Sequence, residues 1–356
     1  MREEREIGLL LGLLRGGSGF RIGPGTFDAG RLIGLAERHG VAYRLWQYAR
    51  EQEGLFAMEQ LTRLGNRCRE SAMRSLSQLQ ELKRIAGVLN EKSIGYACIK
   101  GPQLSRMVYG REALKESVDL DILLVRAGDL PAVHDMLTHQ GYTRSNLNTY
   151  KKPWARKLFL VAKREVAYYN PEQKCAIDLH VRPGANTYLT AGRFKDLLTA
   201  LIPFDLEGTP VPVLPDEAYF VYLCYHGALH QFSRLAWLMD IRAFLQLKKN
   251  TLDYAVVRNI ASTLWAERHV GLALQLLEDY YGDEIPGPLS GLVTRSNRMR
   301  FLASNCRRMI GRDTSYGLSL KGRFGKLVYM MVLLRGWAGK VDWIYGIIMR
   351  MLAGRV

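Results

Sequence analysis

Apolar side chains recur at helical spacing in the first part of the chain. Over residues 67–90 one face carries small and aliphatic side chains three or four positions apart, with Arg, Glu, Lys and Gln between them: Ala72, Leu76, Leu79, Leu82, Ala86 and Leu89. This periodicity predicts an amphipathic helix of about six turns that packs its apolar face into a core. Residues 27–50 show the same pattern, interrupted only at Gly40, and are also predicted to be helical.

The pattern becomes that of strands near residue 94. A short apolar run ends at Lys100-Gly101, which predicts a strand followed by a tight turn. The expected elements are two strands alternating with two short helices: 95–99, 102–109, 118–125 and 129–140. Gly141 is placed to end the second of these helices.

Side chains alternate between the two faces of a strand, and here the alternation gathers acidic residues. Asp119 and Asp121 share one face of the strand over 118–125, while Val118, Leu120 and Ile122 take the other. A later pair of strands with a polar turn is predicted over 165–181. Asp178 lies on one face of its second strand, and that strand can pair beside the first two acids.

A helical pattern returns after residue 215. Asp216 can cap a helix to about residue 231, and Ser233 can cap the next to about residue 247. The fold class expected is α+β, a small mixed β-sheet with N-terminal helices and a C-terminal helical region. The expected segments are an N-terminal helical part, a core with the acids, a second helical part and a basic tail: 1–92, 93–210, 211–290 and 291–356.

Composition changes this picture only at the C-terminal end. The chain has 356 residues, 48% of them hydrophobic, and a net charge of +16. Residues 291–356 contain 13 Lys and Arg against two acidic residues, so most of the excess charge lies there. An anionic partner is therefore plausible.

Three interpretations of the basic tail stay open. The arginines of 295–312 can form a solvated helix face, or they can bind RNA, although the RRM and KH patterns of RNA-binding domains are absent. Alternatively, the tail lies on an anionic membrane surface, because residues 327–352 mix Trp, Tyr and Met with Lys and Arg.

The five cysteines are an odd number and are widely spaced, which argues against a disulfide framework and against a CxxC zinc site. The apolar runs 7–14 and 327–334 are too short to span a bilayer. We therefore expect a cytoplasmic protein, or one peripheral to the inner face of the membrane.

Three acids gathered on strands repel one another, and divalent cations remove that cost. Two acids at this spacing can equally end a strand or face solvent, so the pair alone is a weak signal. The glycine turn before it and the later Asp178 strengthen it. Mg²⁺ or Mn²⁺ is the cofactor that such oxygen ligands favour.

The combination of motifs resembles the bacterial family of uncharacterised nucleotidyltransferases, within the superfamily typified by DNA polymerase beta. The resemblance rests on a glycine turn, two acidic strands, a histidine pair and a tryptophan segment: Ile99-Lys-Gly-Pro-Gln-Leu, Asp119-Leu-Asp-Ile-Leu-Leu-Val, Ile177-Asp-Leu-His, His226-Gly-Ala-Leu-His230 and Arg234-Leu-Ala-Trp-Leu-Met-Asp240. It extends over residues 27–280.

This resemblance implies a role for each acid. Asp119 and Asp121 would hold both metal ions, and Asp178 would complete the one that activates the acceptor. The implied reaction is attack by an acceptor hydroxyl or phosphate on the α-phosphorus of ATP or another nucleoside triphosphate, with release of pyrophosphate.

The resemblance also implies nucleotide-binding residues. Gly101 would let the backbone approach the triphosphate, and Lys100 is a natural phosphate partner. The family often has an arginine before its two acids, and Lys115 is the nearest basic residue here. His180 can orient the acceptor, although a polar strand position explains it equally well.

Several alternatives remain at this point. His226 and His230 share a helix face, and with Asp240 they form either a second metal or acceptor site or a buried hydrogen-bond network; a buried acid needs a partner, which favours the network. The acceptor can be a small molecule, a peptide or a glycan. A different transferase of a polysaccharide or peptide natural-product pathway, or a non-catalytic membrane-peripheral binding module, would carry the same acids.

Overall fold

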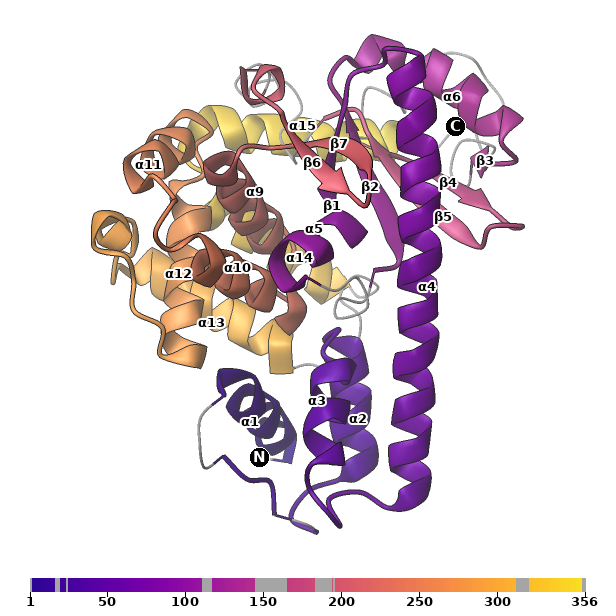
Figure 1. Ribbon diagram of the computed structural model, residues 1–356. Helices are drawn as coiled ribbons and strands as arrows, with labels where there is room; N and C mark the ends of the chain where they lie inside the picture. The colour runs from indigo at the N-terminus through magenta and orange to yellow at the C-terminus, as the bar shows by residue number, and fades with distance from the viewer. Residues whose placement is uncertain are drawn as a thin grey trace. The chain divides into compact units, whose positions relative to one another are not determined.

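The computed structural model describes residues 2–16, 20–23, 25–110, 117–144, 165–182, 194, 196–311 and 320–353. The chain divides into two compact units, the first mainly Met1–Ala72 and Phe220–Leu334, the second mainly Met73–Ala113, Ser117–Tyr219 and Arg335–Val356. The described elements are many helices and a small mixed sheet (Figure 1), which confirms the expected α+β class. The expected boundaries at residues 92, 210 and 290 stay a prediction.

The first unit is helical. Its elements, including the first half of α4 and most of α9, are α1 (Arg2–Arg15), α2 (Ala29–Arg38), α3 (Ala42–Arg50), α4 (Met58–Glu91), α9 (Asp216–Leu229), α10 (Leu235–Lys248), α11 (Tyr254–Thr263), α12 (Glu267–Tyr281), the 3₁₀ helix η3 (Gly287–Leu292), α13 (Asn297–Gly311) and α14 (Leu320–Leu333).

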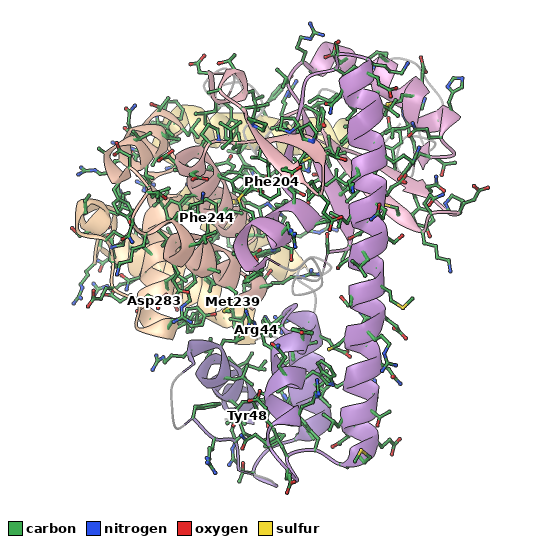
Figure 2. The ribbon with its side chains drawn as sticks, in the orientation of Figure 1. Arg44, Tyr48, Phe204, Met239, Phe244 and Asp283 are labelled. Carbon is green, nitrogen blue, oxygen red and sulfur yellow. The ribbon has the colours of Figure 1, made fainter. Side chains whose placement is uncertain are left out.

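The predicted interruption at Gly40 separates α2 from α3. Gly40 has φ 67°, a left-handed conformation that glycine adopts without strain. Asp28 caps α2 by accepting a hydrogen bond from the Arg31 amide. The Tyr48 hydroxyl of α3, labelled in Figure 2, accepts a hydrogen bond from the Ile22 amide and so attaches the segment before α2.

The predicted helix over 67–90 is confirmed, but it starts earlier than predicted: α4 begins at Met58. Gly65 and Asn66 weaken helix propensity and hide this start in the sequence. The glycine is required by packing: a Cβ there would lie 2.9 Å from Nε1 of Trp46. A tertiary contact therefore overrides the local preference.

Ser233 does not cap α10, contrary to the expectation from the sequence. The N-cap position is Arg234, which makes no side-chain cap. His39 serves the helix instead: Leu235 N–H donates to its Nδ1 at 3.2 Å, and Ala236 N–H donates to its carbonyl at 3.0 Å. Its Nε2 then donates to the Ile310 carbonyl, also at 3.2 Å. A cap supplied from a distant helix leaves no local signal in the sequence.

The second unit contains the sheet, in the order β1-β2-β5-β4-β3. Its elements are β1 (Tyr96–Lys100), α5 (Pro102–Tyr109), β2 (Asp119–Leu124), the 3₁₀ helix η2 (Ala127–Asp129), α6 (Leu130–His139), β3 (Thr143–Arg144), β4 (Glu165–Asn170), β5 (Cys175–His180), β6 (Ile202–Leu206), β7 (Thr209–Val213) and α15 (Gly336–Ala353). The predicted strand, helix, strand, helix order and the later antiparallel hairpin are confirmed.

A second hairpin, β6–β7, was not predicted from the sequence. Three prolines lie in it, which disguises strands. Glu207 and Gly208 form its two-residue turn with φ 52° and 83°, and Asp205 Oδ1 accepts a hydrogen bond from the Gly208 amide at 2.9 Å. Positive φ at both central residues is typical of the tight turns that join antiparallel strands.

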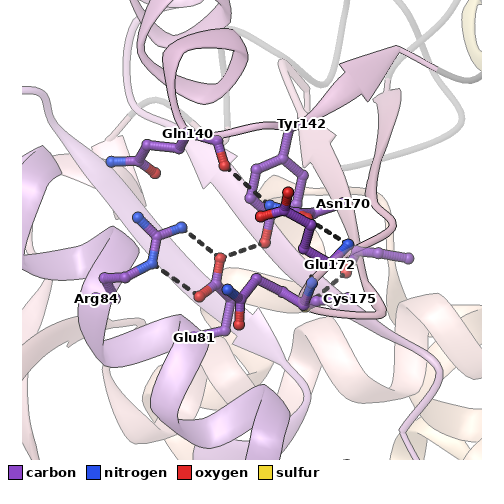
Figure 3. A network of polar contacts seen from close by, with 9 residues as sticks. Glu81, Arg84, Gln140, Tyr142, Asn170, Glu172 and Cys175 are labelled. Atoms are coloured by element: carbon purple, nitrogen blue, oxygen red, sulfur yellow. Dashed lines mark hydrogen bonds and ion pairs between the residues drawn. The ribbon is translucent and has the colours of Figure 1, made fainter.

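A polar network holds the C-terminal half of α4 against the sheet (Figure 3). The buried Glu81 carboxylate accepts hydrogen bonds from the Tyr142 hydroxyl at 2.6 Å and from Arg84 Nε at 2.8 Å. Burial opposes ionisation of Glu81, but these two partners outweigh it and hold its pKa below the usual range. Asn170 continues the network by donating to the Gln140 carbonyl at 2.9 Å.

The basic tail contains helix α13, whose arginines lie on its exposed face while its apolar residues other than Phe301 are buried. One of them, Arg307, forms an ion pair with Asp279. Arg312 lies outside the described residues. Within the part of the chain that the structure describes, no helix combines the length and the apolar character needed to cross a bilayer.

Candidate active site

The pairing of β2 with β5 brings the predicted acids together. The two strands run parallel with Asp121 opposite Asp178 and Asp119 opposite Ala176. Paired residues of a parallel ladder point to the same face, and side chains two apart along a strand do the same. All three carboxylates therefore lie on one face of the sheet, and Ile177 and Leu179 fill the core on the other.

A bulge in β1 adds Lys100 to this face. The register of β1 on β2 shifts between Cys98, which opposes Ile122, and Lys100, which opposes Asp121. Without the shift, Lys100 would follow Cys98 onto the opposite face. With it, the lysine Nζ lies 3.0 Å from Asp121 Oδ1, and its side chain is only 17% exposed.

Asp121 is the buried centre of the cluster, 6% exposed. Its Oδ1 accepts hydrogen bonds from Lys100 Nζ and, at 2.9 Å, from Nε2 of His180. Burial opposes the charged carboxylate, but Lys100 and His180 outweigh it and hold the pKa of Asp121 below its usual value. Burial likewise opposes the charged lysine, but Asp121 and the other acids raise the pKa of Lys100.

Asp119 and Asp178 are affected more by other carboxylates than by these two cations. Each carboxyl group is among the causes of the other's pKa shift. Burial, together with the charges of Asp121 and Asp178, raises the pKa of Asp119 to about 7. Burial and the nearby Glu165 and Asp121 carboxylates raise the pKa of Asp178 as well. Like charges this close are costly when both groups are ionised, which is why the pKa of each is raised.

The turn after β1 requires a glycine. Gly101 has φ 105° and ψ −148°, a combination that is essentially restricted to glycine. Gln103 Nε2 donates to the Lys100 carbonyl at 2.6 Å, and Ser117 Oγ donates to the Asp119 carbonyl at 2.8 Å. These bonds fix the turn beside the start of β2, where Asp119 begins the acidic face.

Glu165 belongs to the same face and was not identified from the sequence. It opposes His180 in the β4–β5 ladder, and its Oε2 lies 3.7 Å from His180 Nδ1. The imidazole thus stands between the buried Asp121 and the half-exposed Glu165. Counting the register outward from the predicted hairpin turn would have placed Glu165 opposite His180.

Lys115 lies outside the described residues. The structure brings the other predicted nucleotide residues, Lys100, Gly101 and His180, to the acidic cluster, and their roles remain proposals.

The histidine pair is in another part of the fold. His226 and His230 share one face of α9, with ring centroids 4.6 Å apart, and both contact Trp237, at 5.4 and 5.2 Å. Asp240 is buried at 3% exposure. These ring contacts support the packing interpretation of the pair.

The acidic face offers oxygen donors that a divalent ion prefers. Among the described residues, no three His, Cys, Asp or Glu side chains are arranged to close on one ion. Asp121 Oδ1 is occupied by Lys100 and His180, so Asp119 and Asp178 are the carboxylates with capacity left. Two carboxylates with phosphate oxygens and water are a common magnesium set, and an ion there would offset the like charges that raise the pKa of both groups. The residues fit a metal that binds together with its nucleotide.

Comparison with known proteins gives one result. Residues 25–282 match a protein family described as uncharacterised nucleotidyltransferase. No curated protein and no solved structure matches the chain.

Proposed function

The chain belongs to this family of uncharacterised nucleotidyltransferases, and from that premise we propose that it moves a nucleoside monophosphate from a nucleoside triphosphate to an acceptor, with release of pyrophosphate. The observation that carries the proposal is the acidic face of the sheet, where Asp121 stands opposite Asp178 and Asp119 lies two residues before Asp121 on the same face. Burying a cluster of like charges costs folding free energy unless a bound cation neutralises them.

Asp119 and Asp178 would hold Mg²⁺ or Mn²⁺ together with phosphate oxygens of the nucleotide. Asp121, which the resemblance implies as a further ligand, keeps its charge through Lys100 and His180 and would add a fixed negative charge beside the ion. The metal would supply charge neutralisation on the phosphates and polarisation of the attacking oxygen. Such an arrangement predicts that metal and nucleotide bind cooperatively.

Lys100 and Gly101 are proposed to contact the triphosphate. The lysine is held at the cluster by Asp121, so its charge is fixed near the place where phosphate charge accumulates. Gly101 has no side chain between the turn and the acidic face, and backbone can approach a phosphate closely there. Pro102 lacks an N–H, so the turn contributes fewer backbone donors than a Gly-Ser turn would.

His180 is proposed to orient the acceptor. Its Nε2 is committed to Asp121, while its Nδ1 faces Glu165, whose side chain is 45% exposed. An acceptor hydroxyl at this edge would meet the imidazole and the Glu165 carboxylate together. Replacing Glu165 by Gln should therefore raise KM for the acceptor more than KM for the nucleotide.

The acceptor class is proposed to be a small molecule, a peptide or a glycan. For location we propose the cytoplasm, with contact to the inner face of the membrane through the basic tail. The proposed reaction at the acidic face depends on neither the acceptor class nor the location.

The test uses each α-labelled nucleoside triphosphate with Mg²⁺ or Mn²⁺ and a cell lysate. Label should pass to an acceptor with the wild-type chain and fall at least about 100-fold with Asp119→Asn or Asp178→Asn. Asp135→Asn is the control, because Asp135 is an exposed carboxyl of α6 in the same unit. Transfer without pyrophosphate release would indicate a different transferase. Folded protein with no transfer and no nucleotide binding would indicate a binding module.

A further inference from the structure

Helix α15 has two apolar faces. Gly339, Trp343 and Gly346 are buried and form the packed face. The exposed face carries five large apolar side chains, with exposed fractions from 39% to 82%: Trp337, Val341, Ile344, Tyr345 and Ile348. At 3.6 residues per turn, these five positions fall in one stripe about 100° wide, opposite the packed face.

An exposed stripe of this kind is unusual on a soluble surface. Exposed apolar side chains normally stand singly, and a contiguous patch marks an interaction site. Every residue of the stripe is apolar or aromatic. Among the described side chains of the helix, the charged one nearest to it is Lys340, whose Nζ lies 5.4 Å from the Trp337 ring centroid.

We propose that the exposed face of α15 lies on an anionic lipid surface, with the helix axis parallel to the membrane plane. Trp and Tyr have rings that favour the boundary between lipid and water, and both are present in the stripe. Lys340 beside Trp337 and the exposed Arg335 at the start of the helix would meet lipid phosphates. Residues 320–356 carry seven Lys and Arg and a single acidic residue.

A second copy of the chain fits the stripe less well. Five side chains exposed to this extent offer roughly 500 Å², whereas a standard interface covers about 800 Å² on each partner. The charge also speaks against self-association, because two basic tails would be brought together. The proposal assigns the membrane contact to α15 rather than to the arginines of α13.

The experiment is sedimentation of the full chain with phosphatidylcholine vesicles that contain about 30% phosphatidylglycerol. The wild-type chain should bind, and Trp337→Glu/Ile348→Glu should lower the partition coefficient at least about tenfold. Leu247→Glu/Val256→Glu is the matched control, because it places the same charges on exposed apolar residues of α10 and α11. All of these positions are exposed, so equal urea midpoints are expected.

A second readout follows Trp337 itself. Vesicles should protect the wild-type fluorescence from acrylamide, and Trp337→Phe should remove most of that protection. Three outcomes would overturn the proposal: wild-type protein that stays in solution, equal loss of binding in the control, or a wild-type dimer that the α15 variant dissociates. Nucleotide binding should be unchanged in the α15 variant, so a failure here is distinguishable from a failure of the proposed function.

Discussion

Replacing Gly101 by alanine isolates the cost of the turn that carries Lys100 to the acids. At φ 105° and ψ −148° an alanine is strained by about 1–3 kcal/mol. Steric clash adds little, because the added Cβ would find its nearest atom, Gln103 Oε1, at 3.4 Å. Alanine also lowers the conformational entropy of the unfolded chain, and this stabilises the folded state by about 0.4–1 kcal/mol. The net loss of folding stability expected is therefore about 1.3 kcal/mol at the middle of the two ranges and at most about 2.6 kcal/mol.

Gly87→Ala is the matched control for this substitution. Gly87 lies in α4, in the same compact unit, and a Cβ there would meet no atom within 4 Å. Alanine in a helix interior is favoured over glycine by about 0.5–1 kcal/mol, so this variant should be more stable than the wild type. The same chemical change thus has opposite signs at the two positions.

Urea unfolding of both full-length variants measures the difference. The midpoint of Gly101→Ala should fall and that of Gly87→Ala should rise, with unchanged slopes. If Gly101→Ala were as stable as the wild type, the conformation of the turn and its role in placing Lys100 would both be refuted.

Three further substitutions test other parts of the account. Asp119→Asn should raise the melting temperature of the metal-free protein by a few degrees, because it removes like-charge repulsion, while abolishing stabilisation by Mg²⁺ with nucleotide. Burial and the charge of Arg38 lower the pKa of His39 from 6.5 to about 3. As the pH falls, the unfolded chain therefore binds a proton at this residue before the folded chain does. The contribution of His39 to folding stability is full above pH 6.5 and falls by up to about 1.4 kcal/mol per pH unit as the pH drops toward 3. His39→Gln should reduce that slope in urea titrations across this window. Tyr142→Phe removes one bond to the buried Glu81 and should cost about 1–2 kcal/mol, whereas Tyr169→Phe, at a half-exposed position, should change the urea midpoint little.

Local patterns were enough to predict the strands and helices around the acidic cluster. Strand alternation placed Asp119 and Asp121 on one face, and the hairpin around residues 170–175 was recognised from its polar turn. The helix over 102–109 has the predicted bounds. A glycine and a proline mark its start, and Gly110, with φ 66°, ends it. These features depend on neighbours in the sequence, which is why the sequence reveals them.

Features that depend on distant residues were not predictable in the same way. The Asp121–Asp178 register requires β5 to insert between β2 and β4, and no local signal states this order. The bulge that turns Lys100 toward Asp121, and the capping of α10 by His39, also result from tertiary packing. Glu165 was predictable in part. The register of the hairpin fixes His180 as its partner, but it does not reveal that the two side chains lie beside the acidic cluster.

The central claim is that the acidic face binds a nucleoside triphosphate through a divalent ion. Calorimetric titration with a non-hydrolysable triphosphate analogue, with and without Mg²⁺, tests it without knowledge of the acceptor. Binding should appear with Mg²⁺ in the wild type and in Asp135→Asn, and weaken at least about tenfold without Mg²⁺ or in Asp119→Asn and Asp178→Asn. Equal affinity in all of these cases would contradict the claim.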